Sequence, residues 1–350
     1  MAVLVAADAV LKAVWHVPSD YLKKIIRYDP SLEPHKRLKP LLDLWLNGAY
    51  NEFRFRLTTD DEGFRRTAPG EPASEKSCEA LFLGDSQTVG VGVNDPDTIP
   101  SLVAAKLGKN VLNTACYGYS NREELALYRS AAFSHPARWT ILCFFAGNDP
   151  YENFKQRKKE GFPSKPARAG MLENAKRFLK QRSSIYNLLD RFRRQRWFNA
   201  ALESSGAVKD RIPGELLIFK KDSSAGPIWE TTDKTLSTLS DEVARNGSRF
   251  LIVFIPDRYQ VDRDYWNQWV EKYRFHPDDF DLSAPNHHLR AFCNEKEIDF
   301  LDTTVFLKEA SQAGSRVYWS VDSHLNLAGN RLIAEALSDY LKNHEEGRKI

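Results

Sequence analysis

The sequence of 350 residues lacks the features that define several common protein classes. Its four cysteines are Cys78, Cys116, Cys143 and Cys293. Cys143 lies in an apolar segment and Cys293 in an expected helix, so buried apolar roles are favoured over a disulfide framework. The net charge is only +3, which gives no overall field for binding nucleic acid. No compact group of His, Cys and Asp completes a metal site, so no metal is expected; the chemistry that the motifs described below predict needs no organic cofactor either.

The sequence also lacks a long apolar run at its amino end. Residues 2–15 are apolar apart from Asp8 and Lys12, but a helix that spans a bilayer needs about 20 apolar residues. The basic segment and the small-residue cleavage site of a signal peptide are absent as well. Two interpretations remain: an amphipathic helix packed on the domain, or the end of a membrane anchor whose start precedes this sequence.

The chain divides at about residue 77. Residues 1–77 are largely polar after the first 15, contain several prolines, and predict an extended lead-in with one or two short helices that wraps the next domain. Residues 78–345 predict a catalytic domain in which strands and helices alternate. The expected strands are 80–83, 110–112, 139–145, 250–255 and 298–301, and the expected helices are 99–107, 121–133, 233–246, 288–296 and 327–342. This pattern predicts a three-layer α/β/α sandwich with a flavodoxin-like parallel sheet in the order 2-1-3-4-5 and a long helical insertion.

Two segments exceed an ordinary connection between strands. The first, about 150–228, is expected to be helical and basic: residues 155–196 hold 14 Lys and Arg against three acidic residues. It is interpreted as a solvated decoration or as a cover that attracts an anionic substrate, surface or membrane. The second, about 257–286, is rich in aromatics. Trp266 and Trp269 either line an acyl or sugar pocket or form the small core of this excursion.

Four short motifs follow one another along the chain. They are Gly84-Asp85-Ser86, the turn that contains Gly118, Gly147-Asn148-Asp149 and Asp322-Ser323-His324. The first three follow expected strands, whose carboxyl ends meet at one edge of a parallel sheet. Taken singly, each motif also fits an ordinary turn, and Asp322 with His324 also fits a pair of metal ligands. Taken together they favour nucleophilic catalysis at a serine.

The residue types supply each part of that chemistry. A serine hydroxyl is a weak nucleophile until an imidazole accepts its proton, and a carboxylate can orient that imidazole. Among the eight histidines, His324 alone has an Asp two or three positions upstream. The Asn148 amide and the Gly118 backbone N–H are the candidate donors to an oxyanion.

In these four motifs the chain resembles the SGNH (GDSL-type) hydrolases, from about Glu79 to the C-terminal helix apart from the insertion. The resemblance implies Ser86 as nucleophile, His324 as base and Asp322 as its orienting group. It implies an oxyanion site made by the Ser86 and Gly118 amides and the Asn148 side chain. Many members of the family have Asp-x-x-His, whereas Asp322-x-His324 resembles the SGNH-like polysaccharide O-acetyltransferases.

The sequence therefore predicts a serine esterase that acts on acyl esters, with O-acetyl groups on a carbohydrate as the expected substrate. The first alternative is an O-acyltransferase that moves an acetyl group to a glycan hydroxyl. The second is a glycan- or partner-binding protein without turnover. Envelope-associated bacterial relatives carry an anchor that ends in a stretch like residues 2–15, which favours the cell envelope over the cytoplasm.

Overall fold

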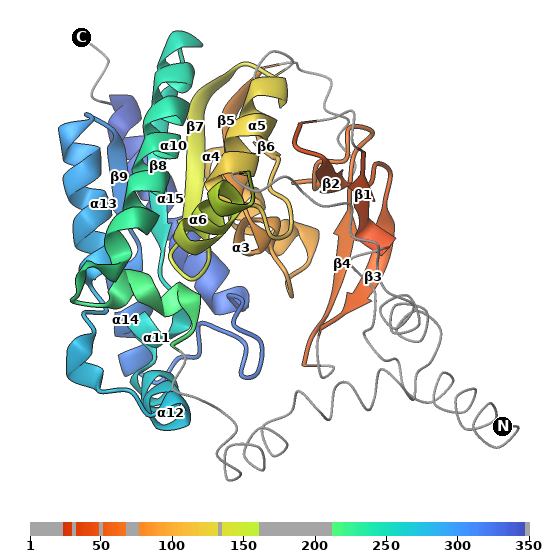
Figure 1. Ribbon diagram of the computed structural model, residues 1–350. Helices are drawn as coiled ribbons and strands as arrows, with labels where there is room; N and C mark the ends of the chain where they lie inside the picture. Colours follow the sequence, from red (N-terminus) through yellow and green to blue (C-terminus); the bar gives the residue numbers. More distant parts are fainter. Residues whose placement is uncertain are drawn as a thin grey trace, which may run out of the picture. The chain divides into compact units, whose positions relative to one another are not determined.

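Five strands form one parallel sheet in the order β6-β5-β7-β8-β9 (Figure 1). The computed structural model describes residues 24–29, 33–48, 52–67, 77–131, 135–160 and 212–346. The strands are β5 Cys78–Gly84, β6 Val111–Asn113, β7 Ala137–Phe145, β8 Arg249–Ile255 and β9 Asp299–Asp302. Numbered along the chain within this sheet, the order is 2-1-3-4-5, which confirms the predicted topology. The sheet and the candidate site belong to one compact unit, residues 25–158 and 212–350.

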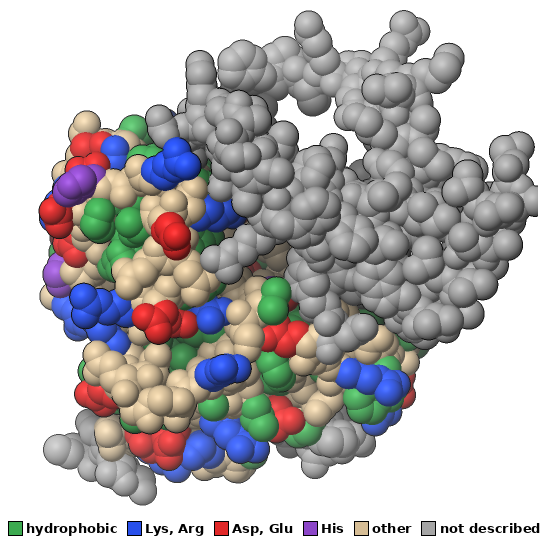
Figure 2. All heavy atoms as spheres, turned by 90° about the horizontal axis from the view of Figure 1, so that it is seen from below, with side chains coloured by type: hydrophobic (Ala, Val, Ile, Leu, Met, Phe, Trp, Pro, Cys, Tyr) green, Lys and Arg blue, Asp and Glu red, His purple; other side chains and the backbone are tan. Residues whose placement is uncertain are grey.

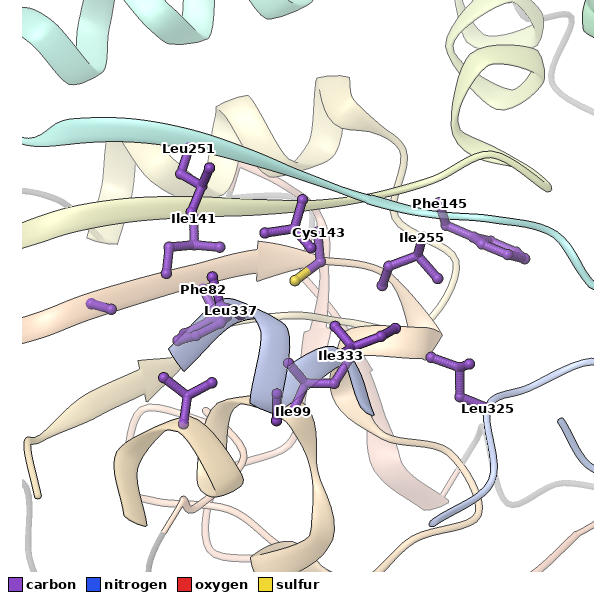
Figure 3. Packing of buried hydrophobic residues seen from close by; sticks show 14 of the residues in the cluster. Phe82, Ile99, Ile141, Cys143, Phe145, Leu251, Ile255, Leu325, Ile333 and Leu337 are labelled. Atoms are coloured by element: carbon purple, nitrogen blue, oxygen red, sulfur yellow. The ribbon is translucent and has the colours of Figure 1, made fainter. Parts of the chain in front are cut away.

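Helices cover both faces of the sheet, which confirms the predicted three-layer α/β/α sandwich. On one face lie α4 (Ile99–Leu107), α14 (Thr304–Gln312) and α15 (Leu327–Glu346), and on the other lie α5 (Asn121–Ala131), α10 (Gly226–Arg245) and α13 (Ala284–Glu295). The central strands are almost continuously apolar because both of their faces are buried. Ile141 and Cys143 of β7 pack with Ile99 and Ile333 (Figure 3), whereas Phe144 points to the opposite layer and stacks on Trp229 of α10.

The described part of the lead-in contains strands that the sequence did not predict. It forms two antiparallel strand pairs: β1 (Ile26–Tyr28) with β2 (Lys36–Leu38), and β3 (Asp43–Asn47) with β4 (Arg54–Thr58). The reason is visible in β4, where polar and apolar residues alternate with the period of a half-buried strand, and Phe55 and Leu57 are buried. The one or two short helices expected in residues 1–77 were assigned to no particular segment and stay a prediction.

Several predictions concern residues that the structure does not describe. The apolar segment 2–15 and the basic helix expected at 171–196 both lie outside the described residues. Within the described ones, no helix combines the length and the apolar character that a membrane span requires. On the face in Figure 2, the Lys and Arg side chains of the described residues lie interspersed with Asp and Glu.

Candidate active site

Ser86 stands where the central strand β5 turns into the short helix α3 (Ser86–Val89). Asp85 caps this helix, because its side chain accepts the Gln87 N–H at 2.8 Å. The turn before it requires glycine: a Cβ on Gly84 would lie 2.1 Å from Thr88 Oγ1. The sequence thus places the Ser86 hydroxyl, which is partly exposed, at the carboxyl edge of the sheet.

His324 contacts Ser86 from a loop at the other end of the chain. Its Nε2 lies 2.8 Å from Ser86 Oγ, and its Nδ1 bonds Asp322 Oδ1. The same Asp322 oxygen accepts the His324 backbone N–H at 2.9 Å. Burial raises the pKa of Asp322, but its hydrogen bonds to His324 and the charge of that ring outweigh burial and hold the pKa below its ordinary value. The carboxylate therefore stays ionised, which favours the tautomer with the proton on Nδ1 and leaves Nε2 to accept the serine proton.

Gln87, next to Ser86, binds the backbone on both sides of His324 and so keeps this loop, the histidine loop, beside the nucleophile. Its side-chain Nε2 donates to the Ser323 carbonyl at 3.3 Å, and its Oε1 accepts the Leu325 N–H at 3.0 Å. These two bonds flank His324 on both sides in the chain. Gln87 could not be identified from the sequence, because nothing in its local pattern points to a backbone partner more than 200 residues away.

Asn148 contacts Asp85, the residue that precedes Ser86 in the turn after β5. Its Nδ2 donates to Asp85 Oδ2 at 2.9 Å, and the same oxygen lies 3.4 Å from Ser86 Oγ. Asp85 is fully buried, and burial raises its pKa. Within the described chain, Asp85 is the single acceptor of the Asn148 amide, so one N–H of that amide stays available for a substrate oxygen.

Gly118 lies in the turn that follows β6 and has a φ of 61°, a left-handed conformation that favours glycine. The turn is joined to the nucleophile turn by the Cys116 N–H, which donates to the Gly84 carbonyl at 3.1 Å. Burial raises the pKa of the Cys116 thiol to about 12, so this cysteine stays protonated at neutral pH. The structure thus brings three of the four motifs into direct contact and links the Gly118 turn to them.

Trp266 and Trp269 lie on α12 (Arg263–Tyr273) within a cluster of aromatic side chains. Trp266 is buried, with ring centroids 5.4 Å from Phe275 and 5.6 Å from Phe280. Trp269 lies 5.7 Å from Tyr259. These contacts favour the interpretation as a small core of the excursion, and the substrate-binding role of the two tryptophans stays a prediction. In the part of the chain that the structure describes, no group of three His, Cys, Asp or Glu residues is arranged to hold a metal.

Two buried acidic residues lie next to Asn148: Asp149, which follows it in the chain, and Glu124, which is linked to Asp149 through Asn121. Glu124 and Asp149 are both fully buried, and Asn121 Nδ2 bridges them, at 2.8 Å from Glu124 Oε2 and 3.1 Å from Asp149 Oδ2. Burial raises the pKa of Glu124 to about 8 and that of Asp149 well above its ordinary value. Burial therefore favours the protonated form of each carboxyl, because an ionised group without a counter-charge is costly in the protein interior.

Replacing Glu124 by glutamine should flatten the pH dependence of stability. Folded Glu124 keeps its proton up to a pKa of about 8, whereas the unfolded chain loses it near 4.5, so stability present at low pH is lost as pH rises through this window. Glutamine cannot ionise. We expect the melting temperature of Glu124→Gln to exceed that of the wild type by about 3–8 °C at pH 9 and to differ little at pH 4.

The matched control is Glu295→Gln, because the Glu295 side chain is 73% exposed and burial does not act on it. It should melt like the wild type at every pH. Melting curves for Glu124→Gln that run parallel to the wild type from pH 4 to pH 9 would show that Glu124 is ionised in the folded protein.

Comparison with known proteins finds one family model that matches part of the chain. Residues 218–349, which contain Asp322 and His324, match the family model described as "SGNH hydrolase-like domain, acetyltransferase AlgX". The predicted SGNH resemblance is confirmed for these residues. The match begins at residue 218 and therefore does not include Ser86. No curated protein shows a significant match to the chain.

Solved structures similar to this chain include the following three. A G-D-S-L family lipolytic protein from Desulfitobacterium hafniense is 12% identical, with 76% of this chain and 99% of that chain covered and a TM-score of 0.41. The esterase EstA from Pseudoalteromonas sp. is 9% identical, with coverage of 78% and 100% and a TM-score of 0.40. The acetylxylan esterase Axe2 from Geobacillus stearothermophilus is 13% identical, with coverage of 76% and 94% and a TM-score of 0.39.

Proposed function

We propose that this chain is a serine ester hydrolase that acts on acyl esters, with O-acetyl groups on a carbohydrate as its substrate class. The observation that carries the proposal is the contact of Ser86 Oγ with His324 Nε2 at 2.8 Å while Asp322 binds the other ring nitrogen. A serine in this arrangement can be deprotonated as it attacks, which is the requirement for acyl transfer through a serine ester.

The first half-reaction forms an acyl-enzyme. Ser86 Oγ attacks the ester carbonyl carbon, and its proton passes to His324 Nε2. The negative charge that develops on the carbonyl oxygen is stabilised by the free N–H of Asn148 and by the backbone amides of Ser86 and Gly118. When the C–O bond of the ester breaks, His324 returns the proton to the leaving alcohol, and the acyl group remains on Ser86.

The second half-reaction releases the acid. Water attacks the acyl carbon and gives a proton to His324 Nε2, and the bond to Ser86 Oγ breaks as that oxygen takes the proton back. Asp322 stabilises the imidazolium in both halves, because its carboxylate stays ionised beside Nδ1.

The second candidate is an O-acyltransferase, in which a glycan hydroxyl takes the place of water. Two observations favour it: the Asp322-x-His324 spacing, and the match of residues 218–349 to a family description that names an acetyltransferase. Both activities pass through the same acyl-Ser86, so they differ only in the acceptor.

The fate of the acetyl group distinguishes the two. Given an activated acetyl ester with and without an oligosaccharide at millimolar concentration, the chain should release most acetyl groups as free acetate. Mass spectrometry of the sugar and an acetate assay measure both products, and Ser86→Ala supplies the background. If most acetyl groups are found on the sugar, the transferase stands and hydrolysis is the minor activity.

A further inference from the structure

Glu52 of the lead-in binds the loop that carries the histidine and its carboxylate. It stands just before β4, and its two carboxylate oxygens accept three consecutive backbone N–H groups. Those of Val321 and Asp322 lie at 3.0 Å, and the third is that of Ser320. Three successive amides that converge on one anion form a strong local binding site for negative charge. Glu52 thus fixes the backbone of Asp322 itself.

The same loop is held on its carbonyl side by a cation. Arg258 Nη1 donates to the carbonyls of Trp319 and Ser320 at 2.9 and 2.8 Å. Beside Glu52, Phe53 packs against Trp319 with ring centroids 4.9 Å apart. The loop therefore has a charged partner for its amides and another for its carbonyls. The amide partner, Glu52, comes from the lead-in, about 270 residues earlier in the chain.

Arg65, a second charged residue of the lead-in, binds the C-terminal end of α3, the helix that Ser86 begins. Arg65 is 1% exposed, and each of its five N–H groups has an acceptor. The acceptors are Asp95 Oδ1 at 2.8 Å and the carbonyls of Arg56 at 3.0 Å, Val89 at 2.5 Å, Gly90 at 2.7 Å and Val93 at 2.7 Å. Val89 and Gly90 close α3, the helix that begins with Ser86. A cation at these carbonyls also suits the negative end of the helix.

A third charged residue binds the Gly118 turn. Lys36 Nζ donates to the Gly118 carbonyl at 2.8 Å, and the Tyr119 hydroxyl donates back to the Lys36 carbonyl. Charged lead-in side chains thus bind backbone atoms of the histidine loop, of the Gly118 turn and of the end of α3, the helix that Ser86 begins. Backbone contacts fix the position of a turn without depending on the side chains that the turn presents.

We propose that Lys36, Glu52 and Arg65 of the lead-in fix the backbone around the active site and that Glu52 is a positioning residue for the Asp322–His324 pair. The proposal rests on the serine ester chemistry proposed above. Glu52 acts through Asp322 and touches neither the substrate nor the reacting atoms. Its loss should therefore reduce turnover by misaligning the base, while the affinity for substrate is retained.

The test compares Glu52→Ala and Glu52→Gln with the wild type in three measurements. The first is kcat and KM for an acetyl ester, with kcat expressed per active site titrated by an organophosphonate. The second is the melting temperature, and the third is hydrogen–deuterium exchange of the 320–322 amides. For Glu52→Ala we expect kcat to fall about 10- to 100-fold with KM within about threefold, and faster exchange of these amides.

Glutamine keeps the length of Glu52 and one neutral acceptor oxygen, so Glu52→Gln should recover part of kcat and part of the protection from exchange. The matched control is Glu62→Gln in the same lead-in, whose carboxylate pairs with His135 at 3.0 Å, away from all three turns. It should retain wild-type kcat and wild-type exchange at 320–322.

The outcomes separate the two proposals. Unchanged exchange of the 320–322 amides in Glu52→Ala, or a lowered melting temperature with full kcat per titrated site, would overturn the positioning role. If the wild type neither reacts with the organophosphonate nor turns over esters, the proposed function fails. The exchange measurement still decides in that case whether Glu52 holds the loop.

Discussion

Ser86→Ala should abolish ester turnover and leave the fold intact. Loss of the nucleophile of a serine triad removes about 10⁵–10⁶-fold in kcat, which brings the rate close to background. The Ser86 side chain is only partly buried at a strand-ending turn, so the melting temperature should change by no more than about 2 °C. Hydrolysis of p-nitrophenyl acetate and a thermal melt on the same preparation check both parts.

The control for this variant is Ser311→Ala on α14, a serine on the helical layer that contributes nothing to the site. It should hydrolyse the ester at the wild-type rate. A well-folded Ser86→Ala protein that keeps near wild-type hydrolysis would remove Ser86 from the role of nucleophile.

Asn148→Ala should lower kcat by about 10²–10³-fold with a smaller change in KM. The amide donates one N–H to Asp85 at 2.9 Å, which fixes the direction of the second. A donor fixed in this way matters most when charge develops on the carbonyl oxygen, so its loss costs transition-state stabilisation. Steady-state kinetics over a full range of ester concentration measures the two constants separately.

Asn246→Ala is the matched control, because its amide binds the Tyr128 hydroxyl at 3.0 Å at the end of α10. It should leave both constants unchanged. An Asn148→Ala effect confined to KM would make Asn148 a residue for substrate binding and would leave the oxyanion to other donors.

The sheet could be predicted because its central strands carry their own signal. β7 and β8 are apolar over almost their whole length, and the expected ranges 139–145 and 250–255 differ from the observed strands by no more than two residues. Helix α10 begins seven residues earlier than expected, at Gly226, because its first turns pack Ile228 and Trp229 into the core. Helix α14 was not predicted, since its nine residues expose Val305 and Phe306 and bury Leu307.

The candidate site was predictable only where its residues sit in local motifs. Ser86, Asn148 and the Asp322–His324 pair each follow a recognisable turn, and the structure brings them together. Glu52 and Gln87 belong to no motif, because their partners are backbone groups about 270 and 238 residues away. No periodicity in the sequence reports such a contact. For the same reason, the polar lead-in was interpreted only as a wrapping segment. Its charged residues Lys36, Glu52 and Arg65 nevertheless bind backbone atoms at or next to the catalytic turns.

In the proposed reaction, Ser86 is the residue that carries the acyl group. The most direct measurement is reaction of the protein with a fluorophosphonate, followed by intact mass analysis and peptide mapping. We expect one adduct per chain on Ser86 in the wild type, none in Ser86→Ala, and much slower labelling in His324→Ala. An adduct on another residue, or an unlabelled wild-type protein under conditions that label a known serine esterase, would contradict the claim.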